Sequence, residues 1–420
     1  MADPRILLVL NNCLSEHNSN GRTMLRLIGG MPRDSISQIY TSGEIADKSF
    51  CGSCLRITNR DAIISYIAKP VCALPEATDS SHGSSPAHHS KKNALTMLLR
   101  DLTWDHSPRL KSILLDWSRK QQPDLILLQV GDASLHIRIA TYLARNLDIP
   151  LLTYNTEDYY FKKHDYMRRT MRPGLFYRLF HHRFCRVFDE LMKLRPVCLY
   201  YCDGLKELYA QRFGDHGRVL YCGSDFSPKK SADTDGPILY AGNLGIGRVD
   251  ALIELGKALQ GIHKELSIDV YGNAPADTVQ TLRSGKGIRY HGSVDYSELR
   301  KLISKSRLLI HVESFDRFIA KDIQYAFSTK LADYMMSGVP ILYCGPDSSE
   351  GARYLARNDM AFIVTNRECA EKQLRDALYD TRRRNQVVDN ALRLAHENHD
   401  LSMIHNKFAA IIDETLRKEC

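Results

Sequence analysis

Two charged residues in the second half of the chain have the types and spacing needed to hold a phosphate and a sugar. Lys330 and Asp333 lie three residues apart in a stretch that predicts a helix, so both occupy one helix face. Ser328 is a candidate N-cap, and Gly338 is a candidate stop before a buried strand that reaches Tyr343. A helix start beside a lysine can bind a phosphate, and a carboxylate one turn later can bind sugar hydroxyls. An ordinary amphipathic helix is the alternative interpretation.

A glycine-rich turn supplies a second candidate phosphate site. Gly242, Gly245 and Gly247 follow an apolar strand, and Arg248 begins the next predicted helix. Glycines let a backbone approach a phosphate closely, while the helix start and the arginine supply positive potential. The turn is neither a strict GxGxxG nor a P-loop, so a plain tight turn is the alternative. Because both stretches follow strands, we expect the two cations to meet at one sheet edge and hold a diphosphate, with the carboxylate on a ribose.

Strands and helices that alternate along the chain must position these residues. In the second half we expect strands at 237–241, 267–271, 288–291, 307–312, 339–344 and 361–364. The helical patterns between them lie near 249–261, 276–282, 296–305, 328–337 and 351–356. In the first half the strand candidates are 5–10, 37–40, 124–130, 150–154 and 197–201. This alternation predicts an α/β protein with parallel, doubly wound sheets.

The order of these patterns suggests two domains. We expect an N-terminal domain over residues 1–212, a linker over 213–236 and a C-terminal domain over 237–385. Helices are expected over 386–420, and packing back on the N-terminal domain is one arrangement for them. Residues 76–92 are rich in Ser and His and predict a mobile loop, with a functional tether as the alternative.

Composition favours a protein kept in the cytoplasm. The chain has 420 residues and 44% hydrophobic content, and no apolar run is long enough to span a bilayer. Its opening apolar run is too short for a signal peptide. The eleven cysteines are an odd number scattered through apolar segments, which is typical of reduced core residues. Cys51 and Cys54 have redox or metal spacing, but no second pair accompanies them, so we expect no metal.

One segment has a composition suited to a lipid surface. Between Phe161 and Arg195 there are ten Lys or Arg against three acids, with aromatic residues interleaved. Such a helix can dock on anionic headgroups, which predicts peripheral membrane contact; a solvated basic helix is the alternative. The net charge of +8 favours anionic partners only mildly. No motif for binding DNA or RNA is present, so no nucleic-acid partner is expected.

Taken together, the chain resembles the GT-B glycosyltransferases, and specifically family 4 (group 1). The resemblance rests on the strand and glycine turn before Arg248, the segment from Tyr290 to Leu299, and the segment around Lys330 and Asp333. The resemblance covers the second half well and the first half in outline. It implies two Rossmann-like, doubly wound domains facing across a cleft, the second of which binds a nucleotide sugar.

In that family, residues of the second domain have assigned roles. The resemblance implies that Arg248 and Lys330 bind the diphosphate and that Asp333 binds the ribose. The turn containing Ser293 and Val294 would lie against the base.

The chain departs from the family pattern at one position. Tyr325 stands where the family has its first motif carboxylate, and a tyrosine cannot replace a carboxylate. Glu313, Asp316 and Asp322 are candidate substitutes, and the sequence does not choose among them.

The first domain of the family binds the acceptor. The loop that leads to Gly21 and Arg22 would lie over the donor phosphates. Glu157 and Asp158 are the acidic candidates to orient an acceptor hydroxyl or accept its proton, and capping of the next helix is the alternative. His136 is expected to face helix packing.

The resemblance therefore implies a retaining glycosyltransferase. It would move a sugar from a nucleotide diphosphate sugar to a hydroxyl of a glycan or lipid-linked glycan in polysaccharide synthesis. Arg248 and Lys330 would stabilise the departing diphosphate, so no cofactor and no metal is expected. A nucleotide-sugar 2-epimerase of the same fold and a non-catalytic partner subunit are the alternatives.

Overall fold

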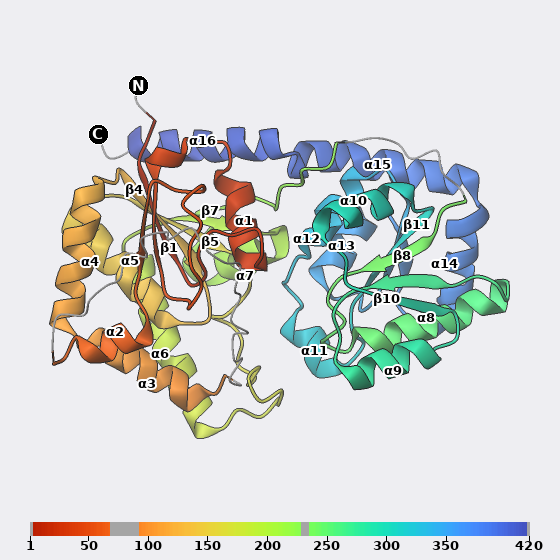
Figure 1. Ribbon diagram of the computed structural model, residues 1–420, viewed down its shortest axis with the longest axis horizontal. Helices are drawn as coiled ribbons and strands as arrows, with labels where there is room; N and C mark the ends of the chain where they lie inside the picture. Colours follow the sequence, from red (N-terminus) through yellow and green to blue (C-terminus); the bar gives the residue numbers. More distant parts are fainter. Residues whose placement is uncertain (1–2, 68–91, 228–234, 418–420) are drawn as a thin grey trace. The chain divides into compact units, whose positions relative to one another are not determined.

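The computed structural model describes residues 3–67, 92–227 and 235–417, and it divides into two compact units (Figure 1). Unit 1 comprises Met1–Tyr221 with Ile404–Cys420, and unit 2 comprises Cys222–Met403. The loop expected at 76–92 lies outside the described residues except for Lys92, and so do residues 228–234 of the expected linker.

Unit 1 is built on a parallel sheet with the strand order β3-β2-β1-β4-β5-β6-β7. Its strands are β1 (Ile6–Leu10), β2 (Ile36–Tyr40), β3 (Ser53–Arg56), β4 (Leu125–Val130), β5 (Leu151–Asn155), β6 (Val197–Tyr200) and β7 (Gly217–Val219). The five strands expected from the sequence are all present. The patterns missed β3 and β7 because these edge strands are short and only partly buried. Strand β7 lies within the range expected to be a linker.

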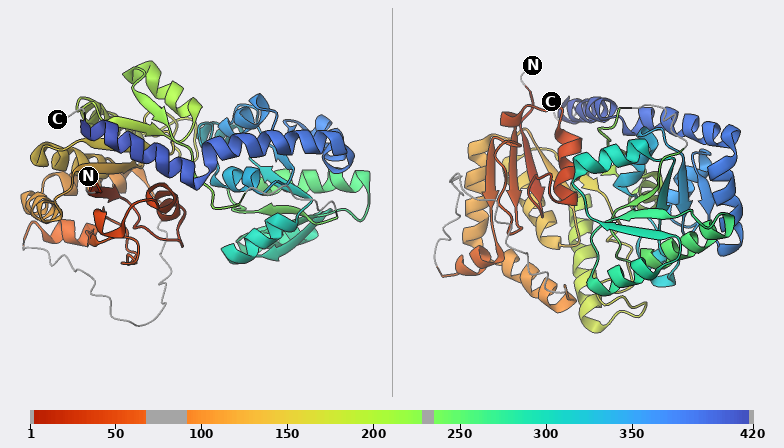
Figure 2. Two further views of the ribbon diagram at one scale, coloured as in Figure 1. Left: turned by 90° about the horizontal axis from the view of Figure 1, so that it is seen from above. Right: turned by 45° about the vertical axis from the view of Figure 1, so that its right-hand side comes forward.

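Helices cover both faces of this sheet (Figure 2). They are α1 (Ser19–Ile28), α2 (Asn59–Ile64), α3 (Ala94–Asp105), α4 (Pro108–Gln121), α5 (Ser134–Leu147), α6 (Leu175–Met192) and α7 (Asp203–Phe213), with a 3-10 turn at Arg33–Ser35. Helix α16 (Leu401–Arg417) belongs to this unit from Ile404 onward. There His405 Nε2 lies 3.0 Å from the carbonyl oxygen of Arg26, and Arg218 pairs with Glu414 at 2.5 Å.

Unit 2 is built on a second parallel sheet with the order β10-β9-β8-β11-β12-β13. Its strands are β8 (Ile238–Ala241), β9 (Ile268–Tyr271), β10 (Ile288–Gly292), β11 (Leu308–Val312), β12 (Ile341–Cys344) and β13 (Phe362–Val364). All six expected strands are present. Across the sheet, the strand numbers fall from β10 to β8 and then rise from β11 to β13. The junction between β8 and β11 is therefore the topological switch point, where doubly wound folds bind ligands. The expected α/β class with two doubly wound sheets is confirmed.

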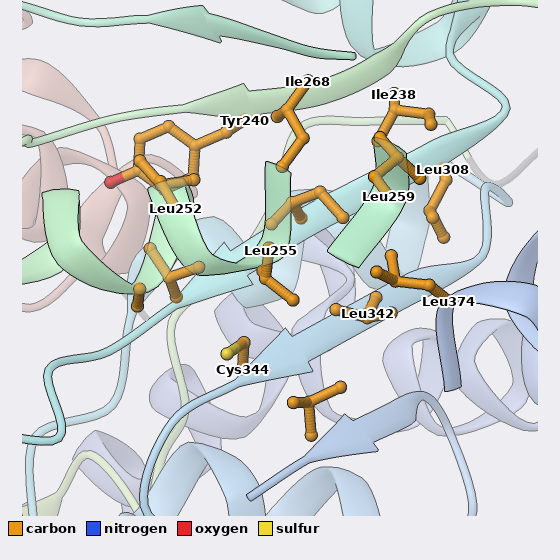
Figure 3. Packing of buried hydrophobic residues seen from close by; sticks show 14 of the residues in the cluster. Ile238, Tyr240, Leu252, Leu255, Leu259, Ile268, Leu308, Leu342, Cys344 and Leu374 are labelled. Carbon is orange, nitrogen blue, oxygen red and sulfur yellow. The ribbon is translucent and has the colours of Figure 1, made fainter. Parts of the chain in front are cut away.

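The helices of unit 2 complete its hydrophobic core (Figure 3). They are α8 (Arg248–Ile262), α9 (Ala276–Ser284), α10 (Tyr296–Lys305), α11 (Arg317–Asp322), α12 (Thr329–Met336), α13 (Glu350–Arg357), α14 (Arg367–Tyr379) and α15 (Thr381–His399). Leu252, Leu255 and Leu259 of α8 pack over the strands, and Leu374 of α14 joins the same cluster. The core therefore fixes the start of α8, which carries Arg248. No described helix of the chain is both long and apolar enough to span a membrane.

Candidate functional site

The glycine-rich turn after β8 makes room for a lysine from a distant helix. Gly242 has φ 148°, a conformation that side chains rarely adopt. A Cβ at this position would lie 2.2 Å from Nζ of Lys330, which comes from α12. Gly247, with φ 70°, occupies the N-cap of α8, and Arg248 is the first residue of that helix. The turn thus brings the two expected cations to the same sheet edge.

Arg248 is fixed by a forked ion pair with Glu313, the residue after β11. Its Nη2 donates to both carboxylate oxygens, at 3.0 Å and 2.9 Å, and its Nε donates at 3.1 Å. The two side chains are 11% and 9% exposed, so solvent screens this pair little. Arg248 Nη1 also donates to the carbonyl oxygen of Asn243 at 3.3 Å, which ties the guanidinium to the glycine turn.

Glu313 stays ionised in this setting. Burial alone would raise its pKa, but a hydrogen bond from His311 and the nearby positive charges lower the pKa to about 2. Burial lowers the pKa of His311, so its ring is neutral at pH 7. His311 Nε2 lies 3.2 Å from Glu313 Oε1 and donates to it. The ring stacks on Tyr343 of β12.

The ammonium group of Lys330 is a covered donor without a polar partner among the described residues, and Nδ1 of the neutral His311 is a covered acceptor without one. Although part of the residue reaches the surface, Nζ is covered and has no hydrogen-bond partner among the described residues. It lies 4.9 Å from the ring centre of Tyr240. Burial and, to a smaller extent, the charge of Arg248 lower the pKa of Lys330 to about 7, although the charge of Glu313 opposes the shift. A buried donor without an acceptor destabilises the protein, so an anion that accepts its hydrogen bond would be bound favourably.

The cluster as a whole can bind a diphosphate. Its members are Arg248, Lys330, Glu313 and a neutral His311, and one positive charge remains when Lys330 is protonated. Arg248 follows the loop after β8, His311 lies in β11 and Glu313 directly follows β11, so these three lie at the switch point of the sheet. A phosphate oxygen beside Lys330 would supply the acceptor that the structure does not provide.

Asp333 lies one turn along α12 and already has protein partners. Its carboxylate accepts a hydrogen bond from Ser224 Oγ at 2.8 Å and one from the Tyr296 hydroxyl at 3.4 Å. Tyr296 begins α10 just after the exposed turn of Ser293 and Val294. Asp333 thus connects α12 to the predicted base-binding turn, and its role on a ribose stays a prediction.

The predicted ends of α12 agree with the structure. Ser328 is the N-cap residue, as expected, although its side chain makes no capping hydrogen bond. Gly338 has φ 71°, as a left-handed stop after a helix requires.

The structure separates the three candidates for the missing carboxylate. Glu313 lies in the cation cluster, whereas Asp316 caps α11 by accepting from the amides of Phe318 and Ile319. Asp322 is the last residue of α11. Tyr325 lies in the turn that follows, half-buried. Of the three, Glu313 alone is placed beside Lys330 and Arg248.

In unit 1, the candidates Gly21 and Arg22 shape the loop that precedes α1. A Cβ on Gly21 would lie 2.6 Å from the carbonyl oxygen of Cys13, so a glycine is needed for this close packing. Asn18 caps the helix by accepting from the amide of Gly21 at 2.6 Å. Arg22 donates from Nε and Nη2 to the carbonyl oxygen of Glu16. These contacts hold the loop itself, and contact with donor phosphates stays a prediction.

The acidic pair of unit 1 divides into an exposed and a buried residue. Glu157 is exposed and accepts from the Tyr159 hydroxyl at 2.9 Å. Asp158 is buried, accepts from the amide of Phe161 at 2.9 Å, and has a pKa raised by burial. Asp158 caps no helix, because the next helix, α6, begins at Leu175, and its contacts hold the loop after β5 instead. Glu157 keeps a carboxylate at the surface. His136 is buried, with Nε2 2.8 Å from Thr41 Oγ1.

Sequence reasoning missed His311, a member of the cluster, and Tyr240, whose ring lies beside the ammonium of Lys330. His311 precedes Glu313 by two residues at the carboxyl end of β11, so both point to the same face of the strand. That spacing is the signal that could have found the histidine. In the sequence Tyr240 has the pattern of a core residue of β8. No local signal indicates that its ring lies beside the ammonium of Lys330.

Comparisons with known proteins agree with this geometry. Residues 250–409 match the family described as glycosyl transferase-like. A comparison with curated protein sequences finds no significant match. Among solved structures, the chain is similar to HepE of Anabaena in complex with UDP, with a TM-score of 0.65, 13% identity, and 98% of this chain and 100% of that chain covered.

Two further structures show the same fold. Sucrose-phosphate synthase from Thermosynechococcus elongatus has a TM-score of 0.62 and 12% identity, with 99% of this chain and 100% of that chain covered. WaaG, a glycosyltransferase involved in lipopolysaccharide biosynthesis, has a TM-score of 0.54 and 12% identity, with coverage of 97% and 99%. The chain therefore has the GT-B fold of these structures, and its residues 250–409 match the family described as glycosyl transferase-like.

Proposed function

We propose that this protein transfers a sugar from a nucleoside diphosphate sugar to a hydroxyl group of a glycan or lipid-linked glycan, with retention of configuration. The observation that carries the proposal is the covered ammonium of Lys330, which has no hydrogen-bond partner within the described part of the chain and lies beside the Arg248–Glu313 pair at the switch point of unit 2. That cluster offers a net positive charge and one unmet donor where this fold binds nucleotides.

A uridine nucleotide is the first candidate for the donor. HepE, which has a similar fold, has been solved with UDP and with UDP-glucose. In this proposal Lys330 donates to a phosphate oxygen and Arg248 adds positive potential. Asp333 binds the ribose when its 3.4 Å hydrogen bond from Tyr296 is exchanged. The exposed turn of Ser293 and Val294 lies beside the base.

The same residues account for the chemical step. As the glycosidic bond to the diphosphate breaks, negative charge grows on the leaving oxygens. Lys330 and Arg248 stabilise this charge without moving, because both are already held in place. Glu157 is the surface carboxylate that we propose for the acceptor hydroxyl. No cofactor enters the proposal, and the absence of a metal stays a prediction.

A lipid-linked glycan is the acceptor class that we favour. WaaG, which shares the fold, is involved in lipopolysaccharide biosynthesis. The basic segment between Phe161 and Arg195 supports the same choice, because a lipid-linked substrate must be reached at a membrane surface.

A thermal-shift screen with UDP-, GDP-, ADP- and dTDP-sugars tests the donor. A bound donor at a hundredfold excess over its Kd stabilises the native state by about 2.7 kcal/mol, which raises Tm by roughly 5 °C or more. Lys330→Met should abolish the shift. Lys286→Met, at an exposed lysine of the same unit, is the matched control and should keep it.

The products decide between reactions. NMR of the stabilising nucleotide sugar incubated with the protein alone should show slow hydrolysis at most. Appearance of a different sugar nucleotide would identify an epimerase and would contradict the transfer proposal.

A non-catalytic partner subunit is a second candidate, which the tyrosine at position 325 favours. In that case the donor would bind with the same dependence on Lys330. No release of free nucleoside diphosphate would follow when glycan acceptors are added, whereas our proposal predicts release.

A further inference from the structure

Helix α3 of unit 1 turns an apolar face outward. Leu95, Leu99 and Leu102 are 39%, 54% and 37% exposed, and their spacing places them in one row along the helix. The buried side of α3 is formed by Ala94, Met97, Asp101 and Trp104. Single exposed leucines are ordinary, but a row of three on one helix is typical of a surface that contacts a membrane or another protein.

The segment at 163–182 exposes further apolar side chains and a set of cations. Leu175, Phe176 and Leu179 are 68%, 47% and 48% exposed. The exposed cations of the segment are Lys163, Arg168, Arg169, Arg172 and Arg178. Its one acid, Asp165, is buried and accepts from the amides of Met167 and Arg168. Positive charge is therefore uncompensated at this surface.

The aromatic residues of this segment do not have the role that the sequence suggested. Tyr177, Phe180, Phe184 and Phe188 are buried in the core of unit 1, and Phe176 is the exposed exception on α6. The expectation of an aromatic membrane face on α6 is therefore wrong in its residues, and the exposed apolar side chains are mostly leucines.

Contacts at both ends hold α3 alongside this segment. Near the start of α3, Lys92 Nζ lies 2.8 Å from Asp132, and the Tyr166 hydroxyl donates to the same carboxylate at 3.3 Å. At the end of α3, Asp105 pairs with Arg183 of α6. Figure 1 shows α3 and α6 packed side by side at this edge of unit 1. The two elements that carry the exposed apolar residues therefore lie side by side.

We propose that this surface docks on an anionic lipid bilayer. We call it the leucine–arginine surface, and it consists of Leu95, Leu99, Leu102, Leu175, Phe176, Leu179, Lys163, Arg168, Arg169, Arg172 and Arg178. The apolar side chains enter the boundary between headgroups and acyl chains, and the cations bind lipid phosphates around them. The charge of one sign beside an apolar patch favours this partner over a neutral protein. The inference goes beyond the proposed function, because it holds whether or not the chain transfers a sugar.

Vesicle flotation of the full-length protein tests the proposal without any nucleotide sugar. The vesicles contain phosphatidylcholine alone or with about 30% phosphatidylglycerol. Binding should require the anionic lipid and fall as salt rises from about 0.1 M to about 0.5 M. The triple variant L95S/L99S/L102S should bind at least about 10-fold more weakly. Ile45→Ser, at a residue of unit 1 that is 73% exposed and outside the surface, should bind as wild type does.

A second triple variant separates charge from apolar area. R169S/R172S/R178S should also weaken binding about 10-fold or more. The control R283S/K286S/R382S removes the same charge from exposed positions of unit 2 and should leave binding within about threefold. In a third variant, Leu99→Trp, the fluorescence should shift to the blue when anionic vesicles are added.

Several results would overturn the proposal. Wild-type protein that binds neither vesicle, or binds both equally, excludes an anionic bilayer as the partner. A leucine variant that binds as wild type does excludes this surface. A change of oligomeric state in that variant, with vesicle binding unchanged, would show that a second copy covers the leucines. A fall in its Tm of more than about 5 °C would show that they pack within the chain.

Discussion

At the scale of single residues, the covered ammonium of Lys330 affects both stability and binding. Burying a cation that has no hydrogen-bonding partner among the described residues destabilises the native state. In a site that binds an anion, the bound ligand pairs the cation and removes this destabilisation. The neighbouring Arg248–Glu313 pair shows the opposite arrangement, in which each charge is satisfied inside the protein. The contrast identifies which cation of the cluster is available to a ligand.

The depressed pKa of Lys330 predicts a specific pH dependence of stability. In the folded state the pKa is about 7, against 10.5 for an unperturbed lysine, so the unfolded state binds more protons between these values. The free energy of unfolding should therefore rise with pH in that window, by up to about 1.4 kcal/mol per pH unit. The rise is measured by urea unfolding of the wild type and Lys330→Met at pH values between 7 and 10. A difference between the two proteins that does not change with pH would contradict the prediction.

Asp333 and Ser224 share a hydrogen bond, so two variants can separate structure from binding. Ser224→Ala and Asp333→Ala should each lower the free energy of unfolding by about 1 to 3 kcal/mol, because each removes a buried partner of the other. If Asp333 also binds the ribose, Asp333→Ala should lower the affinity for UDP about 10-fold, and Ser224→Ala should lower it less than about threefold. The measurements are urea unfolding and calorimetric titration. Equal effects of the two variants on UDP would show that Asp333 has a structural role only.

At the scale of elements, the loop after β8 and the start of α12 depend on each other. Gly242 leaves the space that Lys330 occupies, and its φ of 148° disfavours any side chain. Gly242→Ala should therefore displace the ammonium of Lys330 and lower the affinity for UDP about 10-fold or more. It should also destabilise unit 2 by about 1 to 3 kcal/mol.

Gly261→Ala is the matched control for this variant. Gly261 lies inside α8, and the nearest atom to its added Cβ would be 4.0 Å away. It should stabilise the protein by about 0.5 to 1 kcal/mol and leave UDP binding unchanged. A Gly242→Ala protein with wild-type affinity would contradict the packing described here.

Much of the element pattern could be predicted from the sequence, and the reason is visible in particular elements. Strands β8 and β11 are apolar runs between turn signals, and the expected bounds of α10 agree with the structure at both ends. Strands β3 and β7 could not be predicted, since edge position and partial exposure remove the apolar signal.

The candidate site was predicted in part. The meeting of Arg248 and Lys330 follows from parallel topology, because both come after strands of one sheet. The bidentate bond to Glu313, the closeness of Tyr240 and the contact of Asp333 with Ser224 depend on packing between segments distant in sequence. No local pattern specifies such contacts.

At the scale of the whole molecule, the two units have different parts in the proposed function. The cation cluster lies entirely within unit 2, where most of the family match also falls. The surface proposed for lipid, and the exposed carboxylate proposed for the acceptor, lie in unit 1. Loss of lipid binding and loss of donor binding should therefore be separable by mutation.

The most direct test of the central claim is calorimetric titration of the full-length protein with UDP and with uridine. The claim is that unit 2 recognises a nucleoside diphosphate through Lys330, so UDP should bind at least about 10-fold more tightly than uridine. Lys330→Met should remove that preference, while Lys286→Met should keep it. UDP and uridine that bind with equal affinity, or a Lys330→Met protein that keeps the full preference for UDP, would contradict the claim.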